Sequence, residues 1–381
     1  MVALGRRRRR RHFCHGRSPC ASKRGVDMPM QARNQGAAPR QVCLVAIPEA
    51  TASTLFGLHD VLSAPTLMGW AQADIAPRAP FDVEIVGVEA GELRLASGVT
   101  VTAGRSIRDM KSPDVVIVPS ILLRQAWRKG QYPAIVDWLR HVHERGALLA
   151  SACSGIFLLG ETGLFDGRDV TVHFGYAPAL AQAYPSMRIQ EQHALVVTGD
   201  REELVSSGAS TSWHDLALYL IARYSGPTLC HEVARLFALQ WHQEGLTPYL
   251  TFDPPTHHGD TQISQIQRWL EKNFAVANPV EEATRCSRLP ARTFKRRFAQ
   301  ATGMTPIAYV HRLRIEDAKR RLERTGNSVE EISWRVGYED AAFFRRLFKR
   351  VTGLSPAQYR KRFLVPEPAR LRPTDAGGLR T

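Results

Sequence analysis

The stretch "FKRRFAQATGMTP", Phe294–Pro306, is nearly restated fifty residues later as "FRRLFKRVTGLSP", Phe344–Pro356. When the two are aligned, two phenylalanines, a Thr-Gly step and a proline coincide in each copy. Upstream the match continues, because "VEE" at Val280–Glu282 returns at Val329–Glu331 with an offset of 49. The chain therefore contains an internal repeat of about fifty residues, in too few copies for a solenoid.

Each copy has the apolar spacing of a helix. Its apolar residues recur at i, i+4 and i+7, which forms one buried stripe. The stripes consist of Phe294, Phe298 and Ala301 in the first copy and Phe344, Phe348 and Val351 in the second. A glycine ends each of these helices and a proline begins the next. A shorter helix, Val280–Ser287 or Val329–Val336, precedes a tight turn, so each copy predicts a helix-turn-helix unit whose second helix enters the major groove of DNA.

The face opposite each apolar stripe is basic. It carries Arg292, Lys295 and Arg296 in the first copy and Arg345, Arg346 and Lys349 in the second. A guanidinium group can bond guanine O6 and N7 together, and a flanking ammonium group can neutralise phosphate. A solvated charged face is the alternative interpretation. The recurrence of the basic face in both copies favours DNA contact, and we expect these six residues to bind double-stranded DNA.

Residues 262–364 resemble the AraC-type DNA-binding domain, in which a long helix joins two helix-turn-helix units. "TPIAYVHRLRIEDAKRRL" (Thr305–Leu322) corresponds to the joining helix, and "EEISWRVGYEDAAFFRRLFKRVTGLSPAQYRKRF" follows the signature of the second unit. Two copies held apart by a stiff helix can reach successive major grooves, roughly one turn of DNA apart. Pro290 stands where the family often has a serine cap, and Ala341-Ala342 offer no side chain for base hydrogen bonds. The second unit is therefore expected to contribute more through phosphate and shape.

The charge of the chain is unevenly distributed. The formal net charge is +15, yet residues 41–259 hold 15 Lys and Arg against 22 acids. Residues 1–40 hold 11 basic residues against one acid, and residues 260–365 hold 22 against 11. Such asymmetry is typical of a protein that binds a polyanion, most often nucleic acid. We expect residues 1–40 to be a disordered basic arm and residues 365–381 a disordered tail.

Composition also argues against several classes of protein. No apolar run approaches the ~18 residues of a membrane span, and no apolar segment follows the N-terminal arginines as a signal peptide requires. Six cysteines are scattered without a C-x2-C pair, so neither a zinc site nor a disulfide framework is predicted. We therefore expect a soluble cytoplasmic protein with no metal, no cofactor and no membrane partner.

From Gln41 onward the pattern changes to short apolar runs alternating with helices. The runs are "QVCLVAIP", "FDVEIVGVEAG", "PDVVIVPS" and "GALLASACSG". Continuous Val/Ile/Leu strands of this kind predict a parallel sheet covered on both faces, an α/β sandwich with ligands at the carboxyl ends of its strands. We assign residues 41–245 to this domain, residues 246–261 to a linker, and residues 262–364 to the DNA-binding domain.

One strand-to-helix corner in this domain resembles a nucleophile elbow. In "LLASACSGIFLLG", Cys153 and Ser154 follow a strand and precede a helix among small residues. His173, expected late in a strand, and Glu49, just after the first strand, are candidates to join Cys153 and Ser154 in a ligand-binding site. A lone cysteine is often only a small buried residue, so packing remains the alternative. Covalent catalysis would require a base within hydrogen-bond reach of the thiol.

Other residues of these types are assigned to packing. Trp213 and Trp241 fall at helical spacing and are expected in the core rather than around a cationic amine. We expect the same of Cys43, Cys230 and Cys286.

The body of the chain resembles the DJ-1/PfpI (class I glutamine amidotransferase-like) domain. "SACSGIFLLGETGLFDGRDVTVHF" is close to that family's elbow and following strand, although "TLFGLHD" (Thr54–Asp60) departs from its usual early motif. The coupling of this domain to an AraC-type module resembles the GlxA-type transcriptional regulators. The resemblance implies a sequence-specific regulator, more often an activator, which binds a small and possibly nitrogenous metabolite and works as a homodimer. It also leaves open a thiol-dependent amidase or glyoxalase-like enzyme that uses Cys153, His173 and Glu49.

Overall fold

The computed structural model of the chain describes residues 38–67, 80–123, 126–256 and 258–364. The predicted arm, residues 1–40, lies outside the described residues except for 38–40. The predicted tail, residues 365–381, lies entirely outside them. Among the described helices, none is long and apolar enough to cross a membrane.

A seven-stranded sheet forms the centre of the first domain, in the order β10-β11-β7-β6-β1-β2-β5. All neighbouring strands are parallel except β10 and β11, and Val42 on β1 pairs with both Val83 on β2 and Val115 on β6. The strands are β1 (Arg40–Val45), β2 (Phe81–Gly87), β5 (Arg105–Ser106), β6 (Val115–Val118), β7 (Leu148–Ala152), β10 (Leu195–Thr198) and β11 (Leu204–Ser207). The residues of β6 and β7 are all buried, as helices on both faces require.

Two small sheets flank the large one. The antiparallel pair is β3 (Gly91–Arg94) with β4 (Thr100–Ala103), and the parallel pair is β8 (Asp169–Val170) with β9 (Arg188–Ile189). The sequence predicts His173 late in a strand, but that strand, β8, ends at Val170. His173 instead precedes the short 3-10 helix η2 (Phe174–Tyr176), so that prediction is wrong.

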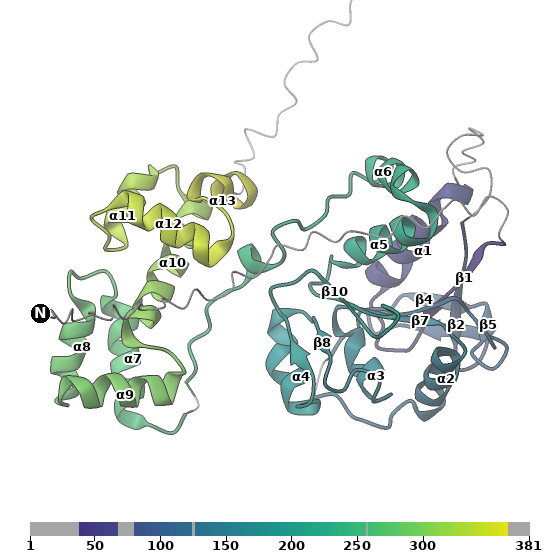
Figure 1. Cartoon of the computed structure of the whole chain (residues 1–381), viewed down its shortest axis with the longest axis horizontal. Coiled ribbons are helices and arrows are strands. Elements are labelled where there is room, and N and C mark those ends of the chain that lie inside the picture. The colour runs from purple at the N-terminus through teal and green to yellow at the C-terminus, as the bar shows by residue number, and fades with distance from the viewer. Residues whose placement is uncertain (1–37, 68–79, 124–125, 257, 365–381) are drawn as a thin grey trace, which may run out of the picture. The chain divides into compact units, whose positions relative to one another are not determined.

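Helices cover both faces of the large sheet (Figure 1). One group consists of α1 (Ala52–Leu67), α5 (Trp213–Ser225) and α6 (Pro227–Leu236), and the other of α2 (Pro133–Glu144) and α3 (Ile156–Gly160). The remaining helix of this domain, α4 (Ala177–Ala183), follows η2. The predicted α/β sandwich is confirmed.

Seven helices follow in the C-terminal domain as the structure describes it: α7 (Thr261–Asn273), α8 (Pro279–Ser287), α9 (Ala291–Thr302), α10 (Pro306–Arg324), α11 (Val329–Arg335), α12 (Ala341–Thr352) and α13 (Pro356–Phe363). Two separate apolar clusters pack them, one around Phe294 and Phe298 and one around Phe344 and Phe348. Each repeat therefore has its own core, which confirms the predicted pair of helical units.

The ends of these helices follow from their capping residues. Gly303 and Gly353 end α9 and α12 in the left-handed conformation, with φ of 71° and 78°. The Asp340 side chain accepts hydrogen bonds from the backbone N–H groups of Ala342 and Phe343, whereas Pro290 gives α9 no side-chain cap. The Asp340 cap therefore fixes the start of α12, and the two glycines fix where α9 and α12 end.

Candidate functional site

Cys153 lies at a sharp corner between β7 and α3. Its φ is 52°, in the left-handed region that residues other than glycine seldom adopt. Gly155, two residues on, has no room for a side chain, because a Cβ there would lie 2.4 Å from the carbonyl oxygen of Val118. The corner is thus pressed against the end of β6. Strain of this kind persists where the surrounding structure fixes it, and it is concentrated at functional sites.

The hydroxyl of Ser154 is taken up by the neighbouring loop. It donates to the carbonyl oxygen of Ile121 at 2.5 Å and accepts from the backbone N–H of Ile121 at 2.8 Å. The Ser120 hydroxyl lies 3.2 Å away, and Ser154 is fully buried. Ser154 therefore fixes the elbow against the loop after β6, and its side chain has no bonding capacity left for a ligand.

The same loop connects the elbow to Glu49. Ile121 forms a β-bridge with Ala50, and the backbone N–H of Leu122 donates to the carbonyl oxygen of Glu49. The Glu49 carboxylate accepts from the Tyr132 hydroxyl at 2.5 Å and from the Gln131 amide at 2.8 Å. Burial and this carboxylate together raise the pKa of Tyr132 well above its ordinary value. Glu49 is therefore oriented by two side chains that the sequence interpretation missed.

The ring of His173 contacts two aromatic side chains. Its ring stacks on Phe174 at 4.2 Å between centroids and meets the Tyr176 ring edge-on at 5.9 Å. Burial, and then the neighbouring Cys153, raise the pKa of Tyr176. Burial lowers the pKa of His173, whose Nδ1 accepts from the backbone N–H of Gly175. The imidazole is therefore mostly neutral at pH 7, and the Tyr176 that it contacts is also influenced by Cys153.

No hydrogen bond joins Cys153 to His173 in the part of the chain that the structure describes. A thiol enzyme would require such a base within reach of the sulfur atom. The structure therefore does not display an activated nucleophile at Cys153.

A buried pair at the start of α5 was also missed. The carboxylate of Asp215, only 2% exposed, accepts from the backbone N–H of His242 at 2.9 Å. Its other oxygen lies 2.6 Å from Nδ1 of the same histidine. His214 is next to Asp215, and burial lowers the pKa of His214. The sequence offered no signal here, because 27 residues separate the two partners.

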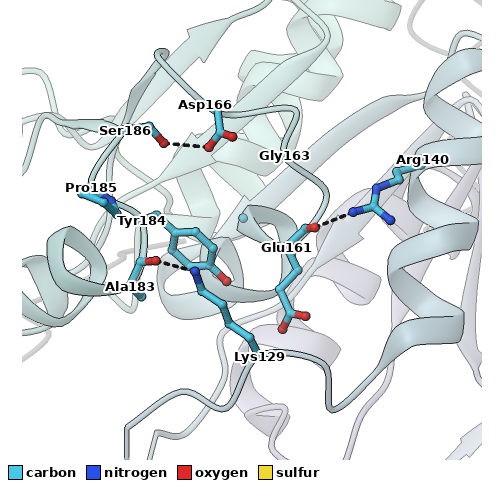
Figure 2. A pocket seen from close by; sticks show the side chains of 10 residues that line it. Lys129, Arg140, Glu161, Gly163, Asp166, Ala183, Tyr184, Pro185 and Ser186 are labelled. Carbon is cyan, nitrogen blue, oxygen red and sulfur yellow. Dashed lines mark hydrogen bonds between the residues drawn. The ribbon is translucent and has the colours of Figure 1, made fainter.

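A cavity of about 370 Å³ lies elsewhere on this domain and is lined by neither Cys153, His173 nor Glu49 (Figure 2). Its charged side chains already have partners. Lys129 donates to the carbonyl oxygen of Ala183 and lies over the Tyr184 ring, and Glu161 accepts from the indole of Trp127 and the backbone N–H of Gly130. Arg140 donates to the carbonyl oxygens of Glu161 and Thr162. We therefore do not place a ligand there.

No group of three or more His, Cys, Asp and Glu side chains that could hold a metal ion occurs among the described residues. His258, in the segment between the two domains, lies 2.7 Å from the Gln267 side chain.

The six predicted DNA-binding side chains are all exposed on α9 and α12. Arg345 pairs with Glu330, and Arg346 lies 4.0 Å from Asp340. The others, Arg292, Lys295, Arg296 and Lys349, have no ion pair within the described ranges. Each second helix therefore presents cations to solvent, with α9 carrying the less engaged set.

One further arginine on α9 has a structural role instead. Arg297 donates through Nε and Nη2 to the carboxylate of Asp260, which caps α7, and through Nη1 to Gln262. It is therefore held against the start of α7 while Arg296, its neighbour, is exposed.

Two packing predictions are wrong. Trp241 is 39% exposed rather than in the core, and Cys286 is exposed on α8. Trp213 is partly buried against the core, and Cys43 and Cys230 are buried, as predicted. Trp241 lies beyond the end of α6 at Leu236, so the helical spacing expected for it does not apply, and the sequence pattern did not place Cys286 on the exposed face of α8.

Comparison with known proteins extends these observations. The model of the DJ-1/PfpI family matches residues 18–223, and a helix-turn-helix domain model matches residues 284–362. The HTH-type transcriptional regulator CdhR of Pseudomonas aeruginosa is 26% identical over 68% of this chain and 76% of its own length. The HTH-type transcriptional regulator GbdR of the same species is 26% identical over 55% of this chain and 56% of its own.

Among solved structures, an AraC family transcriptional regulator from Pseudomonas putida aligns with 52% of this chain and all of that chain. The alignment has a TM-score of 0.43 and 20% sequence identity.

Proposed function

Because the chain belongs to the DJ-1/PfpI family and also contains a helix-turn-helix domain, we propose that it is a transcriptional regulator that binds a small metabolite and DNA. The observation that carries this proposal is the pair of α9 and α12, each with a buried phenylalanine stripe and an exposed basic face. A single unit reads few bases, whereas two units in one chain can read two successive major grooves. CdhR and GbdR, the two relatives described above, are both named HTH-type transcriptional regulators.

The DNA-binding role falls to residues 262–364. In the first unit, Arg292, Lys295 and Arg296 are free to reach base edges and phosphates. In the second unit, Arg345 and Arg346 must leave Glu330 and Asp340 to do so, whereas Lys349 has no such partner. The first unit therefore contributes more of the sequence specificity, and the second contributes phosphate contacts.

The sensing role falls to residues 41–245, which the segment 246–261 connects to the DNA-binding domain. The effector contacts Cys153, His173 and Glu49 at the carboxyl edge of the sheet, while Ser154 holds the elbow in place. A neutral imidazole and a carboxylate oriented by Tyr132 suit a small polar ligand with hydrogen-bond donors, consistent with a nitrogenous metabolite. The regulator acts in the cytoplasm as a homodimer and activates transcription. It does not turn its ligand over.

A ligand screen on the full chain tests this role. Ligand at about 100 times its dissociation constant should stabilise the protein by about 2.7 kcal/mol. We expect a small nitrogenous compound to raise the melting temperature, to lose this effect in Cys153→Ala, and to change the affinity for DNA. A compound that stabilises the protein equally in Cys153→Ala binds elsewhere and removes this site from the proposal.

The alternative function, a thiol-dependent amidase or glyoxalase-like enzyme, is favoured only by the strained backbone of Cys153. It predicts that the stabilising compound is consumed, and that Cys153→Ala abolishes its consumption. Mass spectrometry of the compound after incubation separates the two functions, because a sensor leaves it unchanged.

A further inference from the structure

Arg314 lies at the junction of the two helix-turn-helix units. It is on α10, which passes from one unit to the other (Figure 1). The first half of α10 contributes Tyr309 and Val310 to the first apolar cluster, and the second half contributes Ile315, Ala318 and Leu322 to the second. Arg314 falls between Val310 and Ile315, where helix α10 passes from one core to the other.

The guanidinium of Arg314 bonds to both units at once. Its Nε donates to the carbonyl oxygen of Phe274 at 2.8 Å, and its Nη2 to that of Val276 at 2.9 Å, both just after α7 in the first unit. Its Nη1 donates to the carbonyl oxygen of Gly337 at 2.6 Å, in the turn of the second unit. Three backbone acceptors on two units therefore converge on one side chain.

The turn of the second unit is shaped around this contact. Gly337 has a φ of 94°, and a Cβ there would lie 2.8 Å from the Arg314 guanidinium carbon and 2.6 Å from the carbonyl oxygen of Ala275. The Tyr338 ring lies 4.9 Å from the guanidinium, and its hydroxyl lies 2.7 Å from Nδ1 of His311, also on α10. We call Arg314, His311, Gly337 and Tyr338 the latch.

The latch buries a positive charge that no carboxylate neutralises among the described residues. Arg314 is only 6% exposed, and no carboxylate pairs with it among the described residues. A buried cation without an anion is costly, and groups of this kind are best known for fixing register rather than for adding stability. Among the described residues no hydrogen bond runs directly from residues 261–310 to residues 325–364, whereas Arg314 on α10 bonds to both ranges.

We infer that the latch sets the relative orientation of α9 and α12, and thereby the spacing of the two half-sites that the chain accepts on DNA. Helix α10 has 19 residues and therefore a length of about 28 Å, somewhat shorter than the roughly 34 Å of one turn of DNA. The helix determines how far apart the units lie, and the latch determines how they are turned about it. Arg314 is a positioning residue, because it is buried and acts through the recognition helices.

This inference rests on the proposed DNA binding, and its test begins with double-stranded DNA that the full-length protein selects from a random library. The selected site is then rebuilt with one, two or five base pairs inserted or one or two removed between its halves, and with one half scrambled. We expect the wild-type protein to prefer one spacing. Arg314→Lys keeps the charge but cannot reach three carbonyl groups. It should therefore weaken that preference, reducing the ratio of affinities between the preferred and the other spacings by roughly tenfold or more.

Two comparisons separate this role from a general loss of structure. Arg314→Lys should bind the site with one scrambled half as the wild type does, and Arg320→Lys, an exposed arginine on the same helix, should keep the wild-type spacing preference. If Arg314→Lys does not fold, Tyr338→Phe, which removes the hydroxyl that bonds to His311, should also weaken the spacing preference.

An unchanged spacing preference in a folded Arg314→Lys protein, or in Tyr338→Phe if the first variant does not fold, would overturn the inference. So would an equal loss of binding at all spacings and at the single half-site. If the wild-type protein selects no sequence at all, the DNA-binding function itself fails instead.

Discussion

The backbone of Cys153 adopts a conformation that only glycine reaches without strain. With φ at 52°, the left-handed region costs another residue about 1–2 kcal/mol. The fold tolerates this because Ser154 bonds to Ile121 and Gly155 packs against the carbonyl oxygen of Val118. The strain places the thiol at the carboxyl edge of the sheet, beside Tyr176, where a ligand is expected.

Two substitutions measure this strain. Cys153→Ala keeps the strained backbone, whereas Cys153→Gly relieves it, so we predict that the glycine variant is the more stable by about 1 kcal/mol. At an ordinary position the order is the reverse, because glycine gains more freedom in the unfolded chain. Chemical denaturation of both variants checks the order. An alanine variant as stable as the glycine variant would contradict a strained elbow.

His173 gives the protein a dependence on pH. Burial lowers its pKa, so the unfolded chain takes up a proton more readily than the folded one. The free energy of unfolding should therefore fall as the pH drops below the unfolded value of about 6.5, and level off below the folded pKa. His173→Asn, which retains a side-chain acceptor for Gly175, should reduce the loss of stability between about pH 7.5 and about pH 5. An identical loss in the variant would show that His173 titrates normally.

At the scale of elements, the sequence predicts most of the helices because their signals are local. The i, i+4 phenylalanines, the glycine caps and the prolines all lie within one turn of the feature that they determine, and the structure confirms them. The contacts of Arg314 and the Asp215–His242 pair were missed because they join segments 23 to 40 residues apart. His173 was assigned to a strand because "DVTVHF" alternates, although only Asp169–Val170 finds a partner strand.

Two glycines, Gly303 at the end of α9 and Gly326 after α10, form a matched pair for testing the cap of α9. At Gly303, with φ of 71°, an added Cβ meets no atom within 4 Å, so only backbone strain opposes it. Gly303→Ala should therefore lower the free energy of unfolding by about 1 kcal/mol. Gly326, also with open space but without a positive φ, serves as the control, and its change to alanine should be neutral or slightly stabilising. Equal effects at both positions would refute the role of Gly303 as a cap.

The recognition helix α9 should carry more of the sequence reading than α12. Arg296→Ala should lose about 1–3 kcal/mol of binding free energy on the selected site and relax the preference at one base pair. Arg346→Ala should weaken binding more evenly across sequences and reduce the salt dependence. Competition binding with single-base variants of the site distinguishes the two. An equal loss for Arg296→Ala on every sequence would make it a phosphate contact.

At the scale of the whole molecule, the charge distribution separates two tasks. The mildly acidic body provides the elbow, and the basic C-terminal domain provides two recognition helices. The sequence predicts this division because the charge distribution and the internal repeat can be seen in the sequence itself. It does not reveal the bond between Glu49 and Tyr132 or the proximity of Tyr176 to Cys153, because each pair comes together only through the sheet order and the loops at its edge.

The most direct test of this account is to measure how the full chain binds DNA selected from a random library, compared with scrambled DNA, at about 0.15 M salt. The account predicts a site with two halves roughly one turn apart, bound at least about a thousandfold more tightly than scrambled DNA. Equal affinity for all sequences, falling steeply with salt, would show that the basic helices bind only the charge of DNA and would contradict the account.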